Sequence, residues 1–204
     1  MTESLSKIIS AIFQPLLVPT YVIICILFDD CFSDIDSWYK WFVVGVVFGM
    51  SAFVPILSIF VMKSLGIVSN IQLNNQRERT LPYCVTFLCY TATIYILHIS
   101  LFPDYIVNIF IGSAISIALL TVINKLFTKI SAHMCGIGGG IAALLVVQKM
   151  EYSETNYFFI LISISFLIAG LIGSSRLKLK AHTPIQILLG FLLGIFSVYQ
   201  FALF

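Results

Sequence analysis

Long apolar stretches, separated by short polar segments, recur along the whole chain. A helix needs about 20 predominantly apolar residues to cross the hydrocarbon core of a bilayer, and each stretch approaches that length. With 60% hydrophobic and 10% charged residues, the chain has too few charges to cover the surface of a soluble domain. The sequence therefore predicts an all-α, polytopic transmembrane helical bundle with six to seven spans, formed by residues 1–204 as a single domain. The expected spans are 8–28, 41–62, 82–101, 105–127, a stretch that starts within 131–140 and ends near 147, 157–173 and 184–204.

Prolines, glycines and cysteines refine this prediction. Pro15 and Pro19 lie early in the first stretch, where they indicate a kink or an interfacial lead-in to the span. Gly190 and Gly194 form a GxxxG pattern in the last stretch, which predicts close helix packing inside the bundle. The five cysteines are odd in number and include no CxxC pattern, so they indicate apolar packing rather than a disulfide or metal framework. No run of Lys and Arg is present, and no nucleic-acid partner is expected.

The polar segments between the stretches are expected to alternate between the two sides of the membrane. Counting crossings places residues 63–81, 126–136 and 174–183 on the same side as the N-terminus, and we call this side the motif face. Such a convergence of distant segments indicates a functional site built from loops and helix ends at one membrane surface. Three pairs of polar residues are expected to meet there: Arg77 with Arg79, Ser131 with His133, and Arg176 with His182.

The last of these segments contains the groups needed to hold and attack a phosphate. Helical spacing puts His182 and Gln186 on one face, because residues four apart lie on neighbouring turns. Arg176 lies six positions before His182, and a guanidinium can bind phosphate oxygens through two parallel hydrogen bonds. The alternative is that the basic residues simply extend to the membrane interface. This alternative accounts for Lys178 and Lys180 but not for His182 and Gln186.

These segments resemble the signature of the type-2 phosphatidic acid phosphatase superfamily, the membrane lipid phosphate phosphatases, in a divergent bacterial-type form. The third motif of that superfamily is Ser-Arg, five residues, His, three residues, Asp. It matches this chain at Ser175, Arg176 and His182. The chain departs from the motif at its last position, where Gln186 replaces the Asp.

The other two motifs match less fully. The second, Pro-Ser-Gly-His, is matched at Ser131 and His133. The first, Lys, six residues, Arg-Pro, is matched at Arg79, while Gln72 stands at the position of the Lys and Pro82 arrives late. One such motif would say little, but three in the family's order on one face form a more specific pattern.

The resemblance implies roles for the matching residues. It makes His182 the nucleophile that forms a phosphohistidine, and it makes His133 the group that protonates the leaving alcohol. Arg79 and Arg176 would bind the phosphate oxygens. Gln186 would accept a hydrogen bond from His182 without contributing the charge of the family's Asp.

Further donors are expected around this core. Ser131 and the backbone N–H groups near Gly136 would add hydrogen bonds at a helix N-terminus, where the dipole favours an anion. Gln72, at the position of the family's lysine, is expected to bind the phosphate too. Because it carries no charge, Arg77 or Lys178 is expected to supply the additional cation. No metal or other cofactor is expected, because this face has no acidic cluster to hold Mg²⁺.

The expected function is therefore that of an enzyme of phospholipid metabolism. The resemblance implies a metal-independent hydrolase acting on a lipid phosphate or a polyprenyl (pyro)phosphate, with membrane lipids as its surroundings. The alternative is a non-catalytic lipid-phosphate-binding or transport protein that retains a degenerate phosphatase site. The ionisable residues gather at one surface and no internal repeat is evident, which favours the enzyme over a secondary transporter.

The distribution of basic residues predicts an orientation. Lys40 and Lys149 are the two basic residues of the opposite face, and the other nine of the eleven Lys and Arg residues fall on the motif face. The positive-inside rule then places the motif face in the cytoplasm. With the resemblance to a bacterial-type family member, the expected location is the bacterial inner membrane. The resemblance implies a site on the outer face of the inner membrane instead. The charge distribution favours the cytoplasmic face, which is the orientation expected for this chain.

Overall fold

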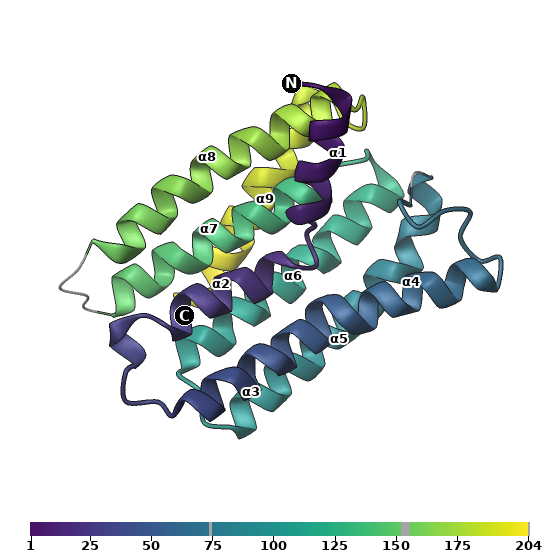
Figure 1. The fold of residues 1–204 in the computed structure, drawn as a ribbon. Coiled ribbons are helices and arrows are strands. Elements are labelled where there is room, and N and C mark those ends of the chain that lie inside the picture. The colour runs from purple at the N-terminus through teal and green to yellow at the C-terminus, as the bar shows by residue number, and fades with distance from the viewer. Residues whose placement is uncertain (74, 152–155, 204) are drawn as a thin grey trace.

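The computed structural model describes residues 1–73, 75–151 and 156–203, and the regular elements in these ranges are helical (Figure 1). Six of its helical segments are long and apolar enough to cross a membrane, which confirms the predicted transmembrane bundle. Four of them are single helices: α6 (Asp104–Leu126), α7 (Ala132–Met150), α8 (Tyr157–Lys178) and α9 (Pro184–Ala202). The other two are composite: α3 (Ser37–Phe48) continues through the π-helical turn η2 (Gly49–Phe53) into α4 (Val54–Ser64), and the 3-10 turn η3 (Gln76–Arg79) continues into α5 (Thr80–Ile99).

The first apolar stretch forms two short helices where the sequence predicts one span. α1 (Glu3–Ile12) and α2 (Val18–Leu27) are separated by a break that contains Pro15. Each has 10 residues and is about 15 Å long, half the thickness of the hydrocarbon core, so neither crosses a bilayer alone. Together the two pieces run from one end of the bundle to the other (Figure 1).

α1 lies against α8 with its apolar side turned outward. Its buried residues are Ser6 and Ser10, whereas Leu5, Ile8 and Ile12 are exposed. An amphipathic helix with this distribution directs its apolar face into lipid and its polar face toward the protein. The interfacial lead-in that Pro15 and Pro19 indicated is therefore a short helix on the flank of the bundle.

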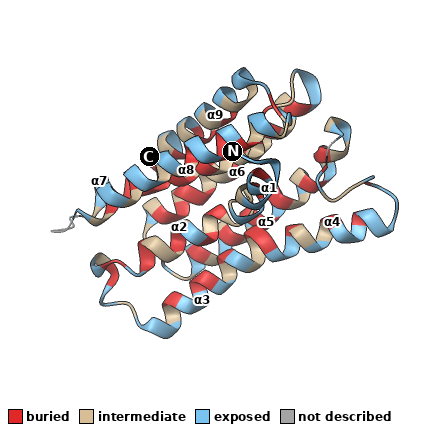
Figure 2. Ribbon diagram, turned by 45° about the horizontal axis from the view of Figure 1, so that its top comes forward, coloured by how far each residue is buried: buried red, intermediate tan, exposed pale blue. Residues whose placement is uncertain are grey.

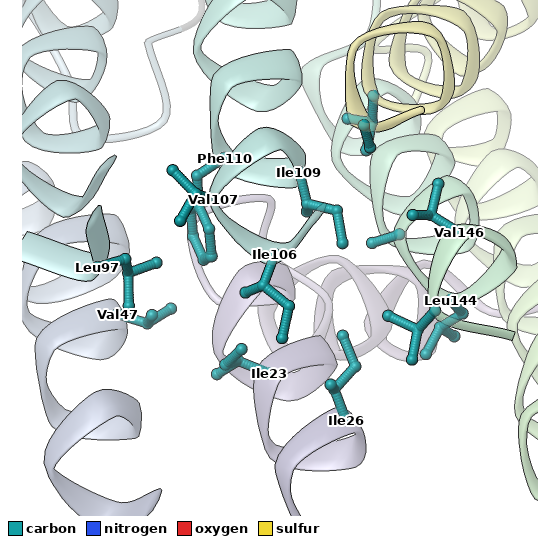
Figure 3. Packing of buried hydrophobic residues seen from close by; sticks show 14 of the residues in the cluster. Ile23, Ile26, Val47, Leu97, Ile106, Val107, Ile109, Phe110, Leu144 and Val146 are labelled. Carbon is teal, nitrogen blue, oxygen red and sulfur yellow. The ribbon is translucent and has the colours of Figure 1, made fainter. Parts of the chain in front are cut away.

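The core lies where α2, α3, α5, α6 and α7 meet. Buried residues gather on the faces that the helices turn toward one another, and the outward faces are largely exposed (Figure 2). Ile23 and Ile26 of α2 approach Ile106 of α6, with Val146 of α7 nearby (Figure 3). Because both sides of α7 are covered by other helices, this element forms the centre of the fold.

Glycines allow α7 and α9 to pack with their backbones almost in contact. A Cβ atom at Gly190 would lie 2.5 Å from the main-chain oxygen of Ser131, and one at Gly194 would lie 2.0 Å from that of Cys135. From the other side, a Cβ at Gly138 would lie 2.4 Å from the main-chain oxygen of Phe191. We call Gly138, Gly190 and Gly194 the glycine seam. The close packing predicted from GxxxG is confirmed, and it occurs inside the bundle.

The motif segments lie together at one end of the bundle, as the count of crossings predicts. This end contains the N-terminus, η3, the turn between α6 and α7 and the turn between α8 and α9 (Figure 1). α8 extends beyond residue 173, where the sequence places its end, and carries Ser175 and Arg176 in its last turns. These two residues are therefore fixed on a helix, not in a loop.

Candidate functional site

Basic side chains from three distant segments meet at the motif face. Arg79 and Arg176 lie close enough to interact electrostatically with each other and with both His133 and His182. Lys129, from the turn between α6 and α7, interacts with Arg79, Arg176 and His182. We call these five residues the cationic cluster. The predicted convergence of the three motifs thus occurs, and Lys129 joins them although the sequence reasoning did not select it.

Arg79 is held by the turn that precedes α5. Its side chain is only 6% exposed, and its Nε donates a hydrogen bond of 2.8 Å to the main-chain oxygen of Leu73. Gln76, in the same turn, donates from Nε2 to the main-chain oxygen of Asn124 in α6. Tyr83, one turn further along α5, is a hydrogen-bond partner of Arg79 and also interacts with Arg176. These bonds orient the Arg79 side chain toward the cluster.

The turn between α6 and α7 is held by hydrogen bonds on both sides. Ile130 N donates to Asn124 Oδ1 over 2.9 Å, and Ser131 N donates to the main-chain oxygen of Gln186 over 3.1 Å. Ser131 is fully buried, and its Oγ caps α7 by accepting a hydrogen bond from Met134 N. The cap gives Ser131 a structural role. Its hydroxyl proton is not used by the cap, so donation to a phosphate stays a prediction.

The turn between α8 and α9 ends in a capping box. Thr183 Oγ1 accepts from Gln186 N, and Gln186 Oε1 accepts from Thr183 N over 3.1 Å. Gln186 Nε2 also donates to Thr128 Oγ1 over 3.4 Å. The pattern Thr-x-x-Gln before an apolar run is the sequence signal for this cap, and the motif comparison overlooked it. Gln186 therefore fixes the start of α9 as well as lying beside His182.

His182 is unprotonated in this environment. It is 7% exposed, and burial, followed by the positive charges of Arg176, Lys129 and Arg79, lowers its pKa to about 4. Hydrogen bonding to Gln186 opposes this shift but does not cancel it. A neutral imidazole keeps a lone pair on one ring nitrogen, which is the form a nucleophile requires.

His133 is held by the N-terminal helix. Its Nε2 lies 3.1 Å from the main-chain oxygen of Ser10 in α1, so the tautomer that fits carries the proton on Nε2 and donates it to this oxygen. The other ring nitrogen, Nδ1, remains for contact with a ligand. No signal in the three motifs indicated this contribution from α1.

Several buried side-chain nitrogen atoms around the cluster lack a hydrogen-bond partner. In the described part of the chain, Arg176 Nε, His182 Nδ1 and Asn124 Nδ2 are buried and make no hydrogen bond. The ion pair that the described residues form, Lys7 with Glu3, is exposed and lies outside the cluster. Burying cations without a counter-charge is costly, so the arrangement fits a site that is completed by an anion.

Gln72, Arg77 and Gly136, which are predicted to bind the phosphate, are not arranged for that role. The side chains of Gln72 and Arg77 are exposed, because η3 turns Arg79 inward and directs its neighbour Arg77 to the surface. Gly136 is the fifth residue of α7, so its N–H belongs to the helix ladder and is not free to bind an anion. A Cβ on Gly136 would lie 3.1 Å from Pro15 Cβ, so this glycine serves packing.

An apolar groove begins beside the cluster. It lies between α2, α5, α6 and α7 and encloses about 890 Å³ of empty space, counting the part that is open to the outside. Tyr83, the hydrogen-bond partner of Arg79, lines the groove, and Val22, Ile23, Phe110 and Ile117 line it together with other mostly apolar side chains. The groove is thus suited to a hydrocarbon chain whose polar end lies at the cluster.

The described residues contain no group of three His, Cys, Asp or Glu side chains arranged to hold a metal ion. Comparison of the chain with protein-family models, with curated proteins and with solved structures finds no match. The likeness to lipid phosphate phosphatases therefore rests on the three short motifs.

Proposed function

We propose that the protein is a membrane-embedded phosphatase that hydrolyses a lipid phosphate or a polyprenyl (pyro)phosphate. The observation that carries this proposal is the buried cationic cluster, in which Arg176 Nε and His182 Nδ1 lack a hydrogen-bond partner and no described carboxylate forms an ion pair. A phosphate dianion would compensate the positive charge and accept a hydrogen bond from Arg176 Nε. The adjacent apolar groove supports a substrate that carries a hydrocarbon chain.

The proposed reaction proceeds in two steps. Arg79 and Arg176 bind the non-bridging oxygens and stabilise the charge that develops on them. The neutral His182 attacks phosphorus, so that an N–P bond forms while the bond to the leaving oxygen breaks. His133 gives a proton to that oxygen, and water then hydrolyses the phosphohistidine to release inorganic phosphate. To act as this acid, His133 must carry a proton on Nδ1 as well as on the Nε2 that faces Ser10.

Phosphate release by the purified protein tests this function. The substrates are phosphatidic acid, phosphatidylglycerophosphate and an isoprenyl diphosphate, each in detergent micelles, with glycerol phosphate as the matched compound without an apolar chain. We expect turnover of at least one lipid substrate and little turnover of glycerol phosphate. Saturable binding of the lipids without any release of phosphate would instead support the non-catalytic binding or transport protein.

The pH dependence of kcat/KM is expected to reflect the lowered pKa of His182. Because this pKa is about 4, kcat/KM should persist as the pH falls below the ordinary range of histidine and should decline only near that value. Gln186→Glu keeps the capping box, and its charge should raise the pKa of His182 and move the decline to higher pH. Gln186→Leu should lower kcat, because both the cap and the partner of the imidazole are lost.

The three pH profiles also define the contrary result. If wild type, Gln186→Glu and Gln186→Leu have the same kcat and the same pH profile, Gln186 does not act on His182.

We also propose that the motif face lies in the cytoplasm of a bacterial cell, on the strength of the excess of basic residues on that side. A reporter fused after the C-terminus should then be active outside the cytoplasm. A cysteine introduced at the exposed position Asn75 should resist an impermeant reagent in intact cells. Labelling of this cysteine without breaking the cells would reverse the orientation.

A further inference from the structure

The cationic cluster contains a lysine that the motif comparison did not assign. Lys129 lies two residues before Ser131, in the turn between α6 and α7, and its side chain is partly buried. It interacts electrostatically with Arg79, Arg176 and His182. Arg79 and Arg176 are the proposed phosphate ligands, and His182 is the proposed nucleophile. The sequence instead predicts Arg77 or Lys178 as the cation that replaces the missing lysine.

We propose that Lys129 binds the phosphate of the substrate and takes the part of the lysine that the first motif lacks. This inference rests on the proposed function for the identity of the ligand as a phosphate ester. It places the third cation on the segment that carries the second motif. Gln72, at the motif position of the lysine, is exposed.

The backbone around Lys129 leaves its side chain little freedom to turn elsewhere. Before it, Thr128 N donates to the main-chain oxygen of Ile123, and Thr128 Oγ1 accepts from Gln186 Nε2. After it, Ile130 N donates to Asn124 Oδ1. The segment is thus fastened to α6 on one side and to α9 on the other, and the direction in which Lys129 leaves the backbone is determined by these bonds.

The surroundings of Lys129 make an anion its expected partner. Burial, followed by the charges of Arg79 and Arg176, lowers the pKa of the ammonium group. No described Asp or Glu forms an ion pair with Lys129. The ion pair that the described residues form joins Lys7 and Glu3. A lysine placed there for stability would have a carboxylate nearby, whereas a lysine placed there for a ligand gains its partner on binding.

Lys125 provides a matched control. It lies four residues earlier, at the end of α6, and its side chain is exposed. The two lysines have the same charge and are in the same polar segment, but only Lys129 faces the cluster. Lys129→Met and Lys125→Met therefore make the same chemical change with and without contact to the proposed phosphate, and Lys129→Arg retains the charge.

The experiment measures kcat/KM on the lipid substrate and thermal stability in detergent, with and without inorganic phosphate. Removing one phosphate donor costs about 10²–10³-fold in rate, so Lys129→Met should lose about that factor in kcat/KM. Lys125→Met should stay within about twofold of wild type, and Lys129→Arg should recover much of the loss. Inorganic phosphate should raise the melting temperature of wild type and of Lys125→Met, but not that of Lys129→Met.

Stability without phosphate separates a ligand-binding lysine from a structural one. Lys129→Met should melt at or above the wild-type temperature, because it removes a buried charge that is repelled by two guanidinium groups. A lower melting temperature without phosphate would assign Lys129 to the fold and overturn the inference. So would wild-type kcat/KM together with undiminished stabilisation by phosphate.

The outcomes also distinguish this inference from the proposed function. If wild type releases phosphate from no lipid substrate but is stabilised by inorganic phosphate, and Lys129→Met is not, the hydrolase proposal fails and the role of Lys129 in binding phosphate stands. If every lipid phosphate is hydrolysed equally by wild type and Lys129→Met, the hydrolase stands and the role of Lys129 fails.

Discussion

His182→Ala is expected to abolish phosphate release from the lipid substrate. The neutral imidazole of His182 is the proposed nucleophile, and alanine offers no atom that can form a bond to phosphorus. Arg176→Ala should be less complete, with a loss of about 10²–10³-fold in kcat, because one donor to the developing charge is removed while the nucleophile remains. The measurement is single-turnover release of phosphate by each purified variant.

His98 supplies the control for this prediction. It is exposed and lies in the last turn of α5. That end of α5 is at the opposite end of the bundle from the motif face (Figure 1). His98→Ala should keep wild-type turnover. Both variants should elute from size exclusion as wild type does, because His182 Nδ1 holds no partner in the described structure. Near-wild-type turnover by His182→Ala would exclude the phosphohistidine scheme.

Gly194→Ala is expected to prevent stable assembly of the bundle. A Cβ at this position would lie 2.0 Å from the main-chain oxygen of Cys135 and 2.8 Å from Gly139 N. Both atoms belong to the backbone, so no side-chain rotation can relieve the overlap, and α9 would have to move away from α7. Overpacking of a core typically costs about 1–3 kcal/mol, and a clash between two backbones should reach or exceed the upper end of that range. Melting temperature and yield of monodisperse protein measure the effect.

Gly170→Ala makes the same substitution where nothing opposes it. No atom lies within 4 Å of a Cβ at Gly170, in α8, and alanine is about 1 kcal/mol more favourable than glycine within a helix. This variant should be as stable as wild type or more so. Equal melting temperatures for Gly170→Ala and Gly194→Ala would mean that α7 and α9 are further apart than the structure has them.

The membrane spans and the seam could be predicted from sequence because each depends on local composition. About 20 apolar residues satisfy the bilayer wherever they pack, and GxxxG places two small residues on one helical face. The break between α1 and α2 was indicated only as a kink or an interfacial lead-in at Pro15. A proline disrupts a helix, but tertiary contacts decide whether the chain bends or separates into two pieces.

The residues of the site were harder to predict. Spacing along the chain cannot distinguish Lys125 from Lys129, since both lie in one polar segment, and only the hydrogen bonds of Ile130 and Ser131 turn one of them inward. In the same way, the sequence cannot distinguish Arg77 from Arg79. The 3-10 turn buries Arg79 and exposes Arg77. The role of α1 beside His133 is a contact between distant parts of the chain, and no motif records it.

The glycine seam gives the two sides of the site unequal mechanical properties. Ser131 and Gln186 lie at the N-terminal ends of α7 and α9. The backbones of these helices are in close contact, and Ser131 N donates to the main-chain oxygen of Gln186. We therefore expect this side of the site to be rigid. The first motif lies on η3, which continues into α5 and is otherwise held by side-chain hydrogen bonds of Gln76, Glu78 and Arg79. Segments with few backbone hydrogen bonds to the rest of the protein open locally most easily. We therefore expect η3 to be the more flexible side of the site. Under the proposed function, local opening of η3 would then admit the headgroup and release phosphate, while His182 keeps its position.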